Sequence, residues 1–558
     1  MERNPLPSPP ISEEGFESDF NAFAHATELS DRVQKASTRD DANFPPTRKQ
    51  FERKMGNSEL SFFLTSREMG VNDMYEAPGL RAHERTMCPS RIRAAWAILR
   101  LRHPLISSRV EMKDYDDVRY IYVPPASPDD ALLDASDNMD CNSQTKDELI
   151  EAFLNGPRLL SDSRLSYLVI SRPGHSFSSL PTPPATPTEE VESPTFSDER
   201  QDYEVFLCAA HHIGDAMALF QMSKEFFDLL GNDMSARELE TTLREEWQAR
   251  YGEPSVQVSP LPPSVEDRLP PIKGKFQQAA AQVDFFNNQN KQIGGQIFPR
   301  KQAKQRRTIV EAVPFDESKT KAIMKKCKLH GVSPSLILFA LCNMSWARIT
   351  ADSDSKRIPM MMYSAVNLRP YLRPNPNPSV DSPFYLAVGY FNVILPTFLP
   401  KLSADRIFWH RARLAAVQCA QAVKNPLLVP RAHMMATQRA RAARSFAKKD
   451  DIRLGITMPK EKETEASRQA PPPSAALVGL SLVGSLDGIH QHCKAPYFEL
   501  TTMKVGTRLR AGGMLMFSYT FGKKLWLNLN WDEHGFERDV VEKFWTGVLA
   551  GVEEFLLA

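Results

Sequence analysis

Residues 203–217 read Tyr-Glu-Val-Phe-Leu-Cys-Ala-Ala-His-His-Ile-Gly-Asp-Ala-Met. The first eight are mostly apolar and have the pattern of a buried strand. Two histidines, His211 and His212, follow at once, and Asp215 stands four residues after the first of them. An apolar run typical of a helix continues from Ala216 to Leu230. This stretch therefore predicts a strand, a turn that carries two histidines, and a helix.

The chemistry of this turn depends on its histidines. Imidazole is the side chain best suited to accept a proton near neutral pH, and a carboxylate at this spacing can brace the turn that aims it. The alternative is that one histidine is structural and the other merely exposed. Because a chain with 12 histidines can easily contain such a spacing by chance, other segments must decide between the two interpretations.

The bulk composition is that of an ordinary globular protein. The chain has 558 residues, 42% hydrophobic and 25% charged, which is enough for two sizeable cores. Its formal net charge of +1 gives no sign of a nucleic-acid partner. The N-terminus lacks the apolar core of a secretory signal, and no apolar run is long enough to cross a bilayer. We therefore expect a cytoplasmic protein that binds neither nucleic acid nor membranes.

The cysteines fit the same compartment. Seven are scattered along the chain without a Cys-x-x-Cys pair, which is typical of free thiols in a reducing environment. The run His490-Gln491-His492-Cys493 falls short of a four-ligand set, so we predict no metal site.

Segments rich in proline, serine or charge divide the chain. Four of them are expected to be flexible or to link folded parts: a flexible N-terminal arm at 1–45, an insert at 173–201, a basic linker at 291–307 and an insert at 448–474. They leave an N-terminal domain over 46–290, which holds the histidine turn, and a C-terminal domain over 308–558.

Strand and helix patterns alternate within both domains. Expected helices cover 92–101, 324–330, 336–346 and 541–556, and expected strands cover 118–123, 165–170, 360–365, 390–395, 515–521 and 525–531. The last two strands form a hairpin around Gly522-Lys523. The sequence thus predicts an α/β protein, with layered helices and sheets, in two domains.

Several segments resemble one superfamily in the same order. The His-x-x-x-Asp spacing of His211 and Asp215 resembles that of chloramphenicol acetyltransferases, peptide-synthetase condensation domains and plant BAHD acyltransferases. The runs 99–106, 323–333 and 364–370 resemble its first helix, its paired helices and a strand that carries an arginine. Residues 211–219 are most similar to the fungal trichothecene 15-O-acetyltransferase family. The resemblance covers about residues 50–558 without the inserts.

The resemblance implies two chloramphenicol-acetyltransferase-like domains with an active-site tunnel between them. His211 is then the general base, because the fourth position after His212 is Ala216 and not an acid. Asp215 pairs with Arg369 and fixes the turn. His212 and Asn367 support the site, with His212 on the opposite side of the strand from His211. Two departures are Ala216 in place of the usual glycine, and the absence of the Asp-Phe-Gly-Trp-Gly box of the plant enzymes.

Other site residues follow from the same resemblance. Ser518 and Thr520 are candidate donors to the oxyanion. Coenzyme A carries phosphates, and two basic clusters are candidates to bind it: Arg439, Arg441 and Arg444 with Lys448 and Lys449, and the linker residues Arg300, Lys301, Lys304, Arg306 and Arg307.

The expected activity is acetyl transfer from acetyl-CoA to a hydroxyl of a small secondary metabolite, of trichothecene or sesquiterpenoid type. His211 acts as base in a ternary complex, with acetyl-CoA as co-substrate, no resident cofactor and a monomeric chain. No Gly-x-Ser-x-Gly elbow suggests a covalent acyl-enzyme. Two alternatives stay open: a condensation-type enzyme that takes its acyl group from a carrier protein, and a homologue that binds small molecules without catalysis.

Overall fold

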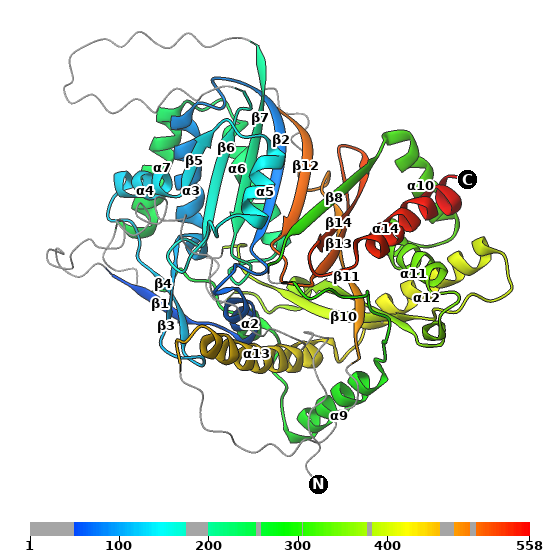
Figure 1. Ribbon diagram of the computed structural model, residues 1–558. Helices are drawn as coiled ribbons and strands as arrows, with labels where there is room; N and C mark the ends of the chain where they lie inside the picture. Colours follow the sequence, from blue (N-terminus) through cyan, green and yellow to red (C-terminus); the bar gives the residue numbers. More distant parts are fainter. Residues whose placement is uncertain are drawn as a thin grey trace, which may run out of the picture.

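The structure is a computed structural model. It describes residues 49–174, 199–252, 258–303, 305–375, 382–457, 474–490 and 498–558. The chain forms two lobes, each built on one large β-sheet, which lie side by side in Figure 1.

The first lobe holds the five-stranded sheet that carries the histidine turn. Its strands, in spatial order, are β12 (Phe498–Thr507), β2 (Met74–His83), β7 (Arg200–Ala209), β6 (Ser166–Ser171) and β5 (Met139–Asn142). Side chains of β7 alternate between two cores: Val205 and Leu207 face one, and Phe206 and Cys208 face the other. The second half of β7, Val205–Ala209, is continuously apolar in sequence because it is buried on both faces of the sheet.

Helices cover both faces of this sheet. The larger core contains α3 (Pro89–Arg102) and α6 (Ala216–Leu230), with α4 (Pro128–Asp137) and α7 (Ala236–Tyr251) packed on α3. The opposite face is covered by α5 (Lys146–Asn155). A small sheet of β1 (Phe51–Lys54), β4 (Val118–Tyr122) and β3 (Arg109–Met112) completes the lobe.

The second lobe has a six-stranded sheet. Its order is β10 (Val388–Leu395), β9 (Met360–Asn367), β11 (Ala476–Ser485), β13 (Met514–Phe521), β14 (Lys524–Asp532) and β8 (Thr308–Phe315). Its core includes side chains of α10 (Glu317–Leu329), α11 (Ile337–Ile349), α12 (Ala404–Val423) and α14 (Arg538–Val552). The expected hairpin is confirmed, and Gly522 and Lys523 both have φ of 60° at its turn.

Two elements of the second half of the chain belong to the first lobe. Strand β12 pairs with β2, and helix α13 (Leu428–Arg453) packs along α2 (Asn57–Ser66), as Figure 1 shows. The prediction of a separate domain made of 308–558 is therefore wrong, since β12 and α13 belong to the first lobe.

Two predicted inserts are also shorter than expected. Helix α13 continues through residues 448–453, where the buried Asp451 forms an ion pair with Arg67 at 2.8 Å. Strand β7 begins at Arg200, inside the segment assigned to the first insert. The rest of both inserts, residues 175–198 and 458–473, and the predicted arm, residues 1–45, lie outside the described residues.

A helix that the sequence did not indicate, α9 (Lys275–Lys291), precedes the basic linker, and the short α8 (Val265–Arg268) lies before it. Among the described helices, none is by itself long and apolar enough to cross a membrane; α10 with Pro334–Ile349 passes that test only as a pair bent by 91°.

Candidate active site

The two histidines lie in a turn after β7. The strand ends at Ala209, and α6 begins at Ala216. Asp215 caps this helix, because its Oδ1 accepts a hydrogen bond from the backbone N–H of Ala218 at 3.1 Å. The sequence predicts that His211 and His212 point in opposite directions because residues of a strand alternate. That reason is wrong, since both residues lie in the turn and not in the strand.

His211 has a defined tautomer. Its Nδ1 lies 2.9 Å from the carbonyl oxygen of Gly214, and a carbonyl only accepts, so Nδ1 carries the proton. In the neutral ring, Nε2 then keeps its lone pair. The ring stacks on Phe62 with 4.3 Å between centroids. Burial lowers the pKa of His211, which favours the neutral, proton-accepting form at pH 7.

His212 is a structural residue. Its side chain is buried between Phe63 and Tyr120, and the Tyr120 hydroxyl donates to the His212 carbonyl oxygen at 2.7 Å. Burial lowers the pKa of His212 to about 3, so the ring is neutral at physiological pH. Its contacts agree with the supporting role expected from the sequence.

The predicted ion pair between Asp215 and Arg369 is present. Nη1 of Arg369 lies 2.9 Å from Oδ2 of Asp215, and the backbone N–H of Ala387 donates to the same oxygen at 2.8 Å. Arg369 is held in turn, because its Nη2 donates to the Tyr385 carbonyl and its backbone N–H donates to Oδ1 of Asn367. The pair therefore fixes the turn of the first lobe to two segments of the second.

Close packing fixes the middle of the turn. A Cβ at Gly214 would lie 2.8 Å from the ring of Phe384, so residue 214 has to be glycine unless that ring moves. Since the Gly214 carbonyl orients His211, this packing bears directly on the imidazole.

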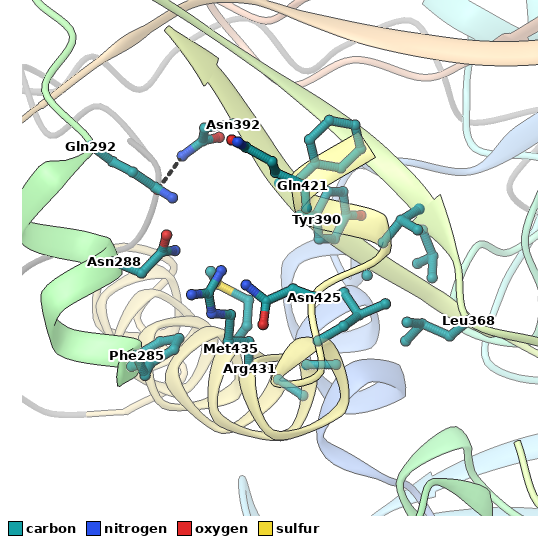
Figure 2. Close-up of a pocket in the computed structure, with 18 of the residues that line it drawn as sticks. Phe285, Asn288, Gln292, Leu368, Tyr390, Asn392, Gln421, Asn425, Arg431 and Met435 are labelled. Atoms are coloured by element: carbon teal, nitrogen blue, oxygen red, sulfur yellow. Dashed lines mark hydrogen bonds between the residues drawn. The ribbon is translucent and has the colours of Figure 1, made fainter. Parts of the chain in front are cut away.

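A cavity of about 910 Å³ lies where elements of both lobes meet. Figure 2 shows Asn288 of α9 facing Tyr390 of β10 across the space, while Oε1 of Gln292 on α9 accepts a hydrogen bond of 2.6 Å from the Asn392 side chain of β10. The cavity has an apolar part and a rim of amides; the amide side chains that line it are Asn288, Gln292, Asn392, Gln418, Gln421 and Asn425. Phe62 also lines the cavity, and its ring stacks on His211. The imidazole therefore lies next to the cavity, separated from it by the ring of Phe62.

Of the predicted coenzyme A cluster on α13, only Arg439 lines this cavity. Arg441 is exposed, and Arg444 forms an ion pair with Asp116 at 2.7 Å. Lys448 and Lys449 lie over the rings of Tyr115 and Phe446.

The linker cluster is engaged elsewhere. Lys301 and Arg307 form ion pairs with Glu537 and Glu533, while Arg300 and Arg306 donate to the backbone carbonyls of Gly512 and Leu154. Lys304 lies outside the described residues. None of the described linker residues lines the cavity.

The structure places Ser518 and Thr520, the predicted donors to the oxyanion, outside the lining of the cavity. Along β13, Phe517, Tyr519 and Phe521 face the larger core of the first lobe. Ser518 and Thr520 alternate with them and share the opposite face with Met516, which packs on the helices of the second lobe. Neither hydroxyl lines the cavity.

No metal centre forms among the described residues, where no group of three or more His, Cys, Asp or Glu could hold an ion. His490 is buried beside Glu76 at 3.2 Å, and residues 491–493 of the same run lie outside the described residues.

Sequence reasoning missed Phe62, Tyr390 and the helix α9. These parts of the site come from three separate regions of the chain, and no local motif marks them. The apolar run Leu60-Ser-Phe-Phe-Leu64 indicates a buried helix, but not the contact between Phe62 and the imidazole.

Solved structures share the fold of this chain. One is a trichothecene 15-O-acetyltransferase, TRI3, from Fusarium sporotrichioides, with 13% identity and a TM-score of 0.66 over 90% of this chain and 95% of that one. Another is the condensation domain of the monacolin K polyketide synthase MokA, with 10% identity and a TM-score of 0.52 over 91% and 98%. The first condensation domain of the CDA synthetase has 8% identity and a TM-score of 0.52 over 90% and 96%.

These likenesses confirm the predicted fold class, a two-lobed α/β fold of the chloramphenicol acetyltransferase and condensation-domain kind. No protein-family model matches the chain. No curated protein sequence matches it either. Membership of the trichothecene 15-O-acetyltransferase family stays a prediction.

Proposed function

We propose that the protein is an acyltransferase that moves an acetyl group from acetyl-CoA to a hydroxyl of a small secondary metabolite of sesquiterpenoid or trichothecene type. The observation that carries the proposal is the state of His211. Its Nδ1–H is held by the Gly214 carbonyl, its Nε2 keeps the lone pair, and its turn is locked by the pair of Asp215 and Arg369.

The chemistry follows from that arrangement. Nε2 of His211 accepts the proton of the acceptor hydroxyl as its oxygen attacks the thioester carbonyl. The tetrahedral intermediate then collapses, the carbon–sulfur bond breaks, and the thiolate takes the proton from the imidazolium. A positioned base of this kind contributes about 10²–10⁴-fold in rate.

Asp215 and Arg369 act as positioning residues in this scheme. They contact the turn and not the reacting atoms, and they hold the imidazole in one orientation. The cavity of about 910 Å³ beside Phe62 would then receive the acceptor, since its size suits a small molecule and its wall combines apolar and amide groups.

The test compares donors. Release of free thiol is measured with acetyl-CoA, and with an acetyl group on the phosphopantetheine arm of a carrier protein, each with and without hydroxylated trichothecenes. We expect acceptor-dependent release from acetyl-CoA. Activity with the carrier-bound donor alone would support the condensation-type alternative, and no activity with either donor would contradict the proposal.

A further inference from the structure

Arg439 stands out in the cavity because its charge is unpaired. Its guanidinium carbon lies 4.5 Å from the ring centroid of Tyr390 and 5.7 Å from that of Phe62. Within the described part of the chain it has neither a hydrogen bond nor an ion pair. A guanidinium presents five N–H donors, and two aromatic faces satisfy none of them fully.

Other arginines near the site have a carboxylate partner. Arg431 lines the same cavity and donates to Asp284 through two bonds of 2.6 and 2.8 Å. Arg369 is paired with Asp215 through one bond, from its Nη1. Removing a cation from water is costly unless an anion replaces the water, and Arg is the side chain best shaped to hold a carboxylate through two parallel bonds.

The cavity wall as a whole is positive. Its charged side chains are Lys291, Lys424, Arg431, Arg439 and Glu266. The one carboxylate among them does not face Arg439 in an ion pair: Oε1 of Glu266 accepts hydrogen bonds from the backbone N–H and the hydroxyl of Ser58. A ligand with a negative group is therefore favoured over a neutral one.

The position of Arg439 limits where that negative group can be. The pantetheine arm of coenzyme A, when extended, separates its phosphates from the thioester by roughly 15 Å, by ordinary bond lengths. By contrast, the single ring of Phe62 contacts both the imidazole of His211 and the guanidinium of Arg439. The anion that suits Arg439 thus belongs to a group close to the reacting atoms.

We propose, resting on the function above, that the cavity recognises an acceptor that carries a carboxylate, and that Arg439 pairs with it through its guanidinium. Within the sesquiterpenoid-like class, a hydroxylated terpenoid acid is then a better acceptor than a neutral alcohol of similar size. The apolar part of the cavity holds the hydrocarbon skeleton, and the amide rim binds its other oxygen atoms.

The test measures binding by calorimetry to the full chain without acetyl-CoA. The probes are benzoate, 1-naphthoate, abietate and gibberellate, each paired with its uncharged methyl ester. We expect at least one acid to bind about tenfold or more tightly than its ester, and Arg439→Gln to abolish that difference. Arg441→Gln, an exposed arginine two residues along the same helix, is the matched control and should keep it.

Two results would overturn the proposal: no acid in the set binds better than its ester, or the preference survives in folded Arg439→Gln. If that variant does not fold, the test uses the wild-type protein instead: phenylglyoxal modifies its arginines, and mass spectrometry measures the extent of modification at each one. The bound acid, but not the ester, should then protect Arg439 while Arg441 reacts in both samples.

A further comparison separates the source of the carboxylate. If it belonged to the acyl group, malonyl-CoA would be preferred over acetyl-CoA with a neutral acceptor, and Arg439→Gln would remove that preference; this outcome contradicts the acceptor assignment. Arg439-dependent binding of acids without any acyl transfer would contradict the proposed function and leave the binding proposal standing.

Discussion

Asp215 and Arg369 form an ion pair of 2.9 Å that joins the turn after β7 to the segment after β9. The Asp215 carboxylate contacts three partners, because it also caps α6 and accepts a hydrogen bond from the backbone N–H of Ala387. The geometry of His211 therefore depends on contacts between the two lobes.

The first prediction concerns the pair itself. We expect Asp215→Ala to lower the free energy of unfolding by about 3 kcal/mol, because it removes a cap and leaves a largely buried guanidinium without its anion. Arg369→Ala should cost less, since the carboxylate keeps two backbone donors.

A double-mutant cycle measures the pair directly. Denaturant unfolding of the two single variants and the double variant should give a coupling energy of about 1–3 kcal/mol. Additive effects would show that the two side chains stabilise the fold independently.

The second prediction concerns Gly214. Its replacement by alanine places a Cβ against the ring of Phe384 and displaces the carbonyl that orients His211. We expect kcat to fall about tenfold to a hundredfold, as for other small displacements of a reacting group. Phe384→Leu in the Gly214→Ala background should restore part of kcat; a double variant as slow as Gly214→Ala would show that this contact is not the cause.

The third prediction concerns pH. Burial lowers the pKa of His211, and a general base works in its neutral form, which dominates above that pKa. The wild-type kcat/KM should therefore hold as the pH falls through about 6.5, the ordinary value for histidine, and decline only below it.

Phe62→Ala tests the cause of that shift. It exposes the imidazole, so the pKa should rise and the loss of kcat/KM should move to higher pH. The profiles of both proteins between about pH 5 and 8 check this, together with an NMR titration of the imidazole. Coincident profiles would rule out burial by Phe62 as the cause.

The fourth prediction concerns the two hydroxyls of β13. Loss of an oxyanion donor typically costs about 10²–10³ in kcat, whereas Ser518→Ala and Thr520→Val should each stay within about threefold of wild type. By strand alternation their side chains share the face of Met516, which packs in the core of the second lobe, and neither side chain lines the cavity. A hundredfold loss in a variant with unchanged melting temperature would place the oxyanion at that strand after all.

The part of the site that could be predicted from sequence is the part that is local. His211 and Asp215 belong to one turn, so their spacing along the chain already indicates that they lie close together in space. Arg369 was found through resemblance, and the ion pair confirms its placement.

The other parts of the site could not be predicted from short stretches of sequence, for two physical reasons. The strand Met514–Phe521 is buried on both faces, so its apolar residues give no period of two and do not show which way Ser518 points. Arg439, Phe62 and Tyr390 meet only because α13 crosses from the second half of the chain onto α2. A long-range crossing of that kind leaves no pattern in any one segment.

The most direct test of the account is acceptor-dependent release of thiol from acetyl-CoA by wild type, His211→Ala and His212→Gln, each checked for folding by circular dichroism. We expect release to fall by about 10²-fold or more in His211→Ala and to be largely kept in His212→Gln. Release by folded His211→Ala at the wild-type rate would contradict the claim that this imidazole is the base.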